Sequence, residues 1–134
     1  MIIGKIGPDL RPMIPLVIQG ANGSETKIPV MLSTAFGETL ILPAAEVASL
    51  GLPSTGTRTV TFPDGSQVEA TVHPTKVLLA GESHDVDLLA GGWEPRMGIK
   101  LLWGYRMSMR FTPGEPVVVE RLTSDTGSIV REPA

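Results

Sequence analysis

The sequence has no cysteine, little aromatic content and no surplus of basic charge. The lack of cysteine excludes disulfides, thiolate chemistry and zinc sites built on cysteine. The net charge is −3 and its mixed signs form no basic stripe, so nucleic acid is not an expected partner. No run approaches about 18 apolar residues, and the N-terminus lacks the features of a signal peptide. We therefore expect a cytoplasmic protein without a membrane or nucleic-acid partner.

Glycine and proline are abundant instead, with 15 glycines and 12 prolines spread along 134 residues. Their spread predicts many tight turns rather than disorder, a pattern typical of an all-β protein. The hydrophobic content of 42% suits a single compact domain. Runs with a β pattern alternate with turn signals, and we expect roughly seven or eight strands among them. The runs cover residues 1–6, 13–19, 26–32, 39–42, 57–62, 67–71, 76–79, 84–89, 105–111 and 117–122.

Two further segments predict short helices. Residues 43–51 begin with proline and end with glycine, which fits the start and the end of one helix. Residues 97–103 predict a second helical turn.

The first two strands of the chain could form an interface edge.

Three short motifs follow one another along the chain. The first is Ser33-Thr34-Ala35, which lies between two apolar runs, the second of which ends at Pro43. The second motif is the hairpin turn Pro63-Asp64-Gly65-Ser66, where glycine permits the positive φ of a tight turn. The third is the apolar segment 97–102, which contains Gly98. In this order the motifs resemble the retropepsin-like, single-domain aspartic proteases over roughly residues 13–122.

The resemblance implies a fold, an assembly and a set of site residues. The fold would be a closed, all-β retropepsin-like barrel with one or two short helices, formed by residues 1–122 and followed by a polar tail at 123–134. The assembly would be a homodimer, because in this family each subunit supplies half of the cleft and one catalytic aspartate. The site residues are Ser33, Thr34 and Ala35 at the family's Asp-Thr-Gly, Pro63, Asp64, Gly65 and Ser66 at the flap, and Met97, Gly98 and Ile99 beside the active-site loop.

Ser33 stands where the family has its catalytic acid. Two aspartates of a dimer share one proton and act as base and acid on a bound water. A hydroxyl cannot replace them, and losing general acid–base assistance alone removes roughly 10²- to 10⁴-fold of the rate. Ala35 also adds a methyl group where the family has glycine. We therefore predict an inactive or impaired aspartic protease homologue, which could still bind a peptide or protein ligand as a homodimer.

Other interpretations of the same residues remain open at this point. An active peptidase could use another group, and Ser33 as a nucleophile would need His73 or His84 within hydrogen-bonding reach. The simpler interpretation is that the Ser33 and Thr34 hydroxyls bond backbone groups of a turn. A structural or assembly module is a third. The string Asp125-Thr126-Gly127 lies in the polar tail, where a chance turn is the stronger explanation.

Two more patterns suggest sites and have simpler explanations. Asp85 and Asp87 share one strand face and could bridge a cation, but a solvated strand face explains the alternation without a metal. Trp93 lies in a glycine-rich loop and is the more plausible surface contact, whereas Trp103 follows two leucines and is expected in the core. We expect no metal and no cofactor.

Overall fold

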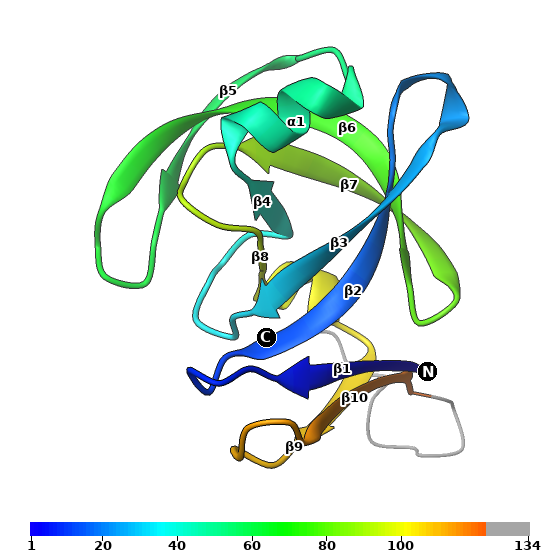
Figure 1. Cartoon of the computed structure of the whole chain (residues 1–134). Helices are drawn as coiled ribbons and strands as arrows, with labels where there is room; N and C mark the ends of the chain where they lie inside the picture. Colours follow the sequence, from blue (N-terminus) through cyan, green and yellow to red (C-terminus); the bar gives the residue numbers. More distant parts are fainter. Residues whose placement is uncertain (123–134) are drawn as a thin grey trace.

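The computed structural model describes residues 1–122, which form ten strands and two short α-helices (Figure 1). The prediction of an all-β fold with one or two short helices is confirmed. The strands are β1 (Ile2–Ile6), β2 (Pro12–Gln19), β3 (Glu25–Leu32), β4 (Leu40–Leu42), β5 (Gly56–Thr61), β6 (Gln67–Leu79), β7 (Glu82–Ala90), β8 (Arg96–Met97), β9 (Tyr105–Met109) and β10 (Pro116–Arg121). The helices are α1 (Ala44–Leu50) and α2 (Ile99–Leu102), with a 3-10 turn η1 at Ala21–Gly23.

All ten strands belong to one sheet, in the order β5-β6-β7-β4-β8-β3-β2-β1-β10-β9. A further pairing of β2 with β6 closes six of these strands, from β6 through β3 to β2, into a ring. Strands β1, β10 and β9 lie together at the bottom of Figure 1, with β5, β6 and β7 above them. In the described range β1 and β2 have neighbours on both sides, and the sheet edges are β5 and β9. The first two strands therefore do not form an interface edge.

Strands β6 and β8 differ most from the prediction. The predicted runs 67–71 and 76–79 are halves of one 13-residue strand, β6. Pro74 lies inside β6 opposite Asp87 of β7. A proline interrupts the hydrogen bonds of a sheet only at a position where the neighbouring strand needs its N–H. Strand β8 has two residues, of which Met97 was predicted as part of a helical turn, because so short a segment carries no period of its own.

Helix α1 follows the predicted chemistry of its ends. Pro43 occupies its N-cap, and Gly51 ends it in the left-handed conformation at φ 70°, where the Gly51 N–H bonds the Ala48 carbonyl. Val47 and Leu50 form its buried face. Both residues belong to the main cluster of buried apolar side chains, so the apolar face of the helix packs on the core.

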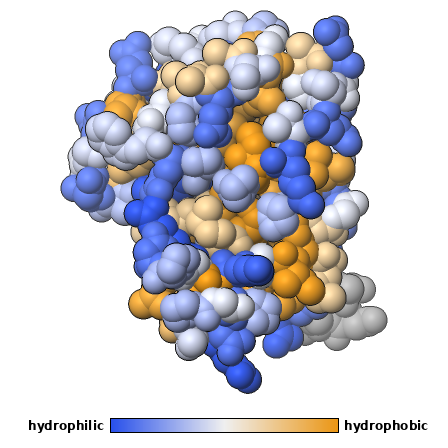
Figure 2. Space-filling view, viewed as in Figure 1, coloured by the Kyte–Doolittle hydropathy of each residue, from blue (hydrophilic) through white to orange (hydrophobic). Residues whose placement is uncertain are grey.

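Buried apolar side chains form two clusters of different size. The main cluster includes Leu16, Leu32 and Met97 of the ring and extends to Ile6 of β1 and Val119 of β10. The second, which we call the hairpin cluster, consists of Phe36, Ile41, Val60, Phe62, Ala70 and Leu89. On the face drawn in Figure 2, apolar residues form a band down the middle and polar residues lie along its margins. No helix within residues 1–122 is long and apolar enough to cross a membrane.

Candidate functional site

The turn that carries Ser33 is built by backbone hydrogen bonds. Strand β3 ends at Leu32, and the Ser33 N–H then donates to the Met97 carbonyl at 2.9 Å. The Phe36 N–H donates to the Ser33 carbonyl at 3.2 Å and closes the turn. The Ser33 hydroxyl has no hydrogen-bond partner among residues 1–122, so the prediction that this hydroxyl bonds the backbone is not met there. The turn is therefore held without any contribution from the side chain at position 33.

Ser33 is half-buried, whereas Thr34 and Ala35 are exposed. The non-glycine residues of the described range with positive φ are Leu10, Asn22 and Ala80, so the Ala35 backbone has no need of glycine. The methyl group of Ala35 consequently projects from the turn rather than straining it.

The segment around Gly98 passes directly beside this turn. Strand β8 lies between β3, to which it is parallel, and β4, to which it is antiparallel. The Gly98 N–H donates to the Thr39 carbonyl, and the Ile99 N–H to the Phe36 carbonyl, each at 2.9 Å. A Cβ at position 98 would lie 2.0 Å from the Glu38 carbonyl oxygen. Only glycine permits this approach, and the structure thus brings Met97, Gly98 and Ile99 to the turn as the resemblance implies.

The hairpin of β5 and β6 carries the four predicted flap residues at its tip. The Gly65 N–H donates to the Phe62 carbonyl at 2.9 Å, and Gly65 has a φ of 87°. Asp64 accepts hydrogen bonds from the Ser66 hydroxyl at 2.6 Å and from the Ser66 N–H at 2.9 Å. These two bonds hold the pKa of Asp64 below its ordinary value of 3.8. The tip is an ordered turn whose carboxylate serves the turn itself.

An aromatic pair joins the hairpin to the Ser33 turn, and sequence reasoning missed it. The rings of Phe36 and Phe62 are stacked with centroids 5.8 Å apart and planes 11° apart. Phe36 is fully buried, and Phe62 is 9% exposed. The available signal was the presence of two of the chain's three phenylalanines next to the turn and the hairpin tip. Because Phe62 flanks the tip and Phe36 closes the turn, the pair holds one motif against the other.

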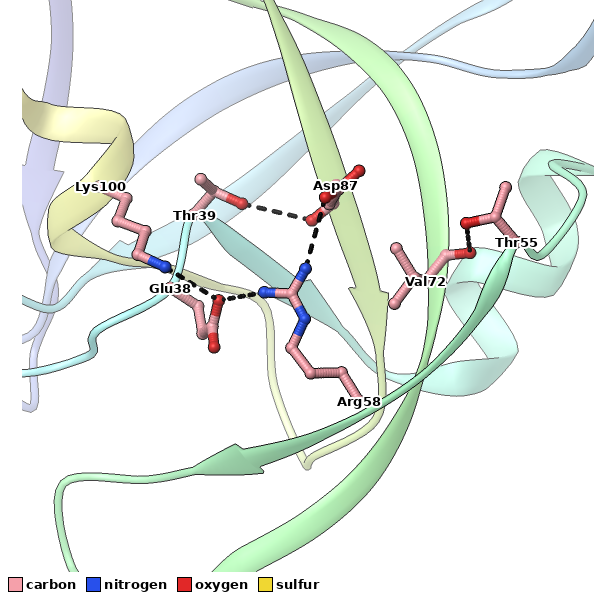
Figure 3. Close-up of polar contacts among 7 residues, drawn as sticks. All are labelled: Glu38, Thr39, Thr55, Arg58, Val72, Asp87 and Lys100. Atoms are coloured by element: carbon pink, nitrogen blue, oxygen red, sulfur yellow. Dashed lines mark hydrogen bonds and ion pairs between the residues drawn. The ribbon is translucent and has the colours of Figure 1, made fainter.

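A polar network anchors the chain that follows the turn (Figure 3). The Arg58 guanidinium of β5 contacts Glu38 at 2.7 Å and Asp87 of β7 at 3.4 Å. Lys100 of α2 lies 3.8 Å from the same Glu38 carboxylate. The Thr39 hydroxyl donates to the Asp87 carbonyl at 3.3 Å. The network connects three elements to the loop before β4. Its residues help to line a groove of about 760 Å³ that the Ser33 turn and the hairpin tip do not line.

The fold has a counterpart among solved structures. The chain is similar to the crystal structure of a retropepsin-like aspartic protease from Rickettsia conorii, with a TM-score of 0.51 over 90% of this chain and 94% of that one. The sequence identity is 16%. The fold is retropepsin-like. No protein-family model matches the sequence, and no curated protein sequence matches it.

Neither histidine of this chain bonds to Ser33. The His73 ring contacts the Leu52 carbonyl at 2.9 Å and the Thr71 hydroxyl at 2.8 Å. The His84 ring contacts the Tyr105 hydroxyl at 2.5 Å. Within residues 1–122 the structure thus gives Ser33 no histidine base. The Asp125-Thr126-Gly127 string lies outside the described residues.

Asp85 and Asp87 are exposed on β7 and each pairs with a cation of the chain, Lys76 and Arg58 respectively. No group of three or more metal-ligating side chains gathers within the described range. Among those residues the acidic face of β7 is thus an ion-paired surface.

The two tryptophans are both exposed. Trp93 is 89% exposed, as expected for a loop contact. Trp103 is 53% exposed, so its prediction as a core residue is wrong. Leu101 and Leu102 take the buried positions of α2, and the chain leaves the helix at Trp103 with an extended backbone. One turn of helix can bury only part of its circumference.

Proposed function

We propose that this chain is a retropepsin-like protein without aspartic peptidase activity. The observation that carries the proposal is the serine hydroxyl at position 33 of a turn whose backbone bonds to Met97 and Phe36 are complete. The chemistry of this fold depends on paired carboxylates that share a proton, and a serine hydroxyl does not ionise near neutral pH. The turn would then support the fold while supplying neither the base nor the acid.

The retained function we propose is the binding of an extended peptide by a homodimer. In the family that the chain resembles, the hairpin covers a cleft to which two subunits contribute. The tip residues Pro63, Asp64, Gly65 and Ser66 lie at the end of a two-stranded hairpin that reaches the turn through Phe62. An extended peptide could pair with exposed backbone there by strand addition.

The test restores the acid and compares three proteins. Purified wild type, a Ser33→Asp/Ala35→Gly variant and a Ser33→Asn/Ala35→Gly variant are incubated with a peptide library from pH 3 to 8, and cleavage is followed by mass spectrometry. We expect cleavage by the aspartate variant alone, because asparagine matches the shape of aspartate but cannot exchange a proton. Cleavage by the wild type at a comparable rate would overturn the proposal.

A second candidate is a structural or assembly module, favoured by one observation. The stacked rings of Phe36 and Phe62 are buried and join the turn to the hairpin, a packed contact that supports the fold without any ligand. A module of this kind would form a defined oligomer in light scattering yet bind no peptide of the library. Saturable peptide binding by the wild type would exclude it.

A further inference from the structure

Arg96 brings a positive charge to the aromatic pair beneath the hairpin. Its guanidinium carbon lies 5.4 Å from the centre of the Phe62 ring and 6.0 Å from that of Phe36. Both distances suit a cation–π contact. The side chain is 17% exposed, so its charge is only partly screened by water. The resemblance leads us to expect an apolar residue at this position, and arginine is therefore a specific feature of this chain.

The strand register explains why Arg96 points toward the hairpin. In β8 the next residue, Met97, is fully buried in the main cluster inside the ring. Successive side chains of a strand point to opposite faces, so Arg96 faces away from that cluster. Its neighbour in β4 is Ile41, which belongs to the hairpin cluster. Arg96 thus shares the face on which the turn and the hairpin meet.

The hydrogen-bonding capacity of Arg96 is largely unused. A guanidinium carries five N–H donors in a planar fork. Among residues 1–122 its one hydrogen bond goes to the Glu94 carboxylate at 3.5 Å. That carboxylate also pairs with Arg11, so one acidic group serves two arginines. The rings lie against the guanidinium, and its remaining N–H groups donate no hydrogen bond within residues 1–122.

We propose that Arg96 makes the site beneath the hairpin selective for peptides with an aspartate or glutamate side chain. This inference rests on the proposed peptide binding. A carboxylate matches the guanidinium fork with two parallel hydrogen bonds. Its negative charge compensates the positive charge of Arg96, which is already partly withdrawn from water. A lysine of the peptide in the place of the glutamate would bring a second positive charge beside Arg96 and be repelled by it. The field of Arg96 also reaches the hairpin tip, where its attraction is the smallest of the effects that lower the pKa of Asp64.

The experiment measures the preference rather than the affinity alone. Three pools of fluorescent decapeptides are random except at one central position, which is fixed as glutamate, glutamine or lysine. Fluorescence anisotropy gives the apparent Kd of each pool for the full-length wild type. We expect the glutamate pool to bind about tenfold more tightly than the glutamine pool, the effect of one charge-assisted pair, and the lysine pool to bind most weakly.

Two variants and one matched control assign the preference to Arg96. Arg96→Met keeps the length and loses the charge, and it should bind all three pools within about twofold of one another. Arg96→Glu should invert the order and favour the lysine pool. Arg106→Met removes an exposed arginine of β9, which lies 4.0 Å from Glu120, and should leave the wild-type preference unchanged. Circular dichroism and thermal unfolding verify that each variant is folded.

The outcomes separate this inference from the function on which it rests. Equal binding of the three pools by the wild type would overturn the role of Arg96 while leaving peptide binding intact. A glutamate preference that survives in both Arg96 variants would overturn it as well. If no pool binds to the folded wild type, peptide binding itself fails and the inference fails with it.

Discussion

The Ser33 turn and the Gly98 segment touch each other, yet Gly98 is the residue that the resemblance implies at its position and Ser33 is not. Gly98 keeps the residue that the family motif has, and the close approach of the Glu38 carbonyl explains why. Ser33 lacks the acid of that motif, and the bonds of its turn run through the backbone alone. The comparison teaches that this fold needs a small residue at the crossing but no particular side chain at the tip of the turn. A serine at position 33 is therefore compatible with this fold.

The largest expected effect comes from Phe36, which joins the turn to the hairpin. Phe36→Ala should lower the free energy of unfolding by about 3–5 kcal/mol, because it empties a fully buried site and removes the stack on Phe62. Urea unfolding measured by fluorescence and circular dichroism gives the change. Phe111→Ala is the matched control, since Phe111 is 69% exposed. Equal losses in the two variants would show that Phe36 does not support the turn.

One methyl group added at position 98 should disrupt the place where the Gly98 segment passes the Ser33 turn. Gly98→Ala should cost about 1–3 kcal/mol of stability, because the added Cβ would meet the carbonyl oxygens of Glu38 and Phe36 at 2.0 and 2.6 Å. Gly37→Ala adds the same group in the same neighbourhood, with no atom within 4 Å and no positive φ. That control should change the stability by no more than about 0.5 kcal/mol. Thermal unfolding of both variants tests the contrast, and a Gly98→Ala protein as stable as wild type would refute it.

The smallest effect concerns the hairpin tip, where the hydrogen bonds serve local order. Ser66→Ala removes the stronger of the two Ser66 contacts to Asp64 and should raise the Asp64 pKa toward 3.8. A lowered pKa means that the folded state binds the proton less tightly than the unfolded chain. This group therefore stabilises the fold above about pH 4 and loses that contribution as the pH falls toward the folded pKa. An NMR titration of the Asp64 carboxyl measures the shift, and an unchanged pKa would contradict the assignment.

The sequence predicted the elements whose signals are local. Pro43 and Gly51 mark the ends of α1, and the Asp64-Gly65 pair marks the hairpin turn, because each acts through its own backbone. The position of Gly98 beside the turn followed from the resemblance. Its steric cause became visible only in the structure.

The features that sequence reasoning missed depend on residues far apart in the chain. Strand β8 forms because β3 and β4 lie on either side of it and pair with it. Two residues are too few to show a strand pattern in the sequence. Phe36 and Phe62 lie 26 positions apart in the numbering, and no spacing rule joins a turn to a distant hairpin. Arg96 departs from the apolar residue that the resemblance leads us to expect at this position. Its contact with both rings required the folded arrangement.

Strand β6 has a mechanical consequence for the hairpin. Its first residues pair with β5 at the hairpin, and from Thr71 onward it pairs with β7, before residues 77 and 78 also meet β2. No loop separates the hairpin from the ring, so the hairpin cannot swing open on a flexible joint. Any opening must bend a continuous paired strand or unzip part of it, which spreads the motion along the sheet and makes it cooperative.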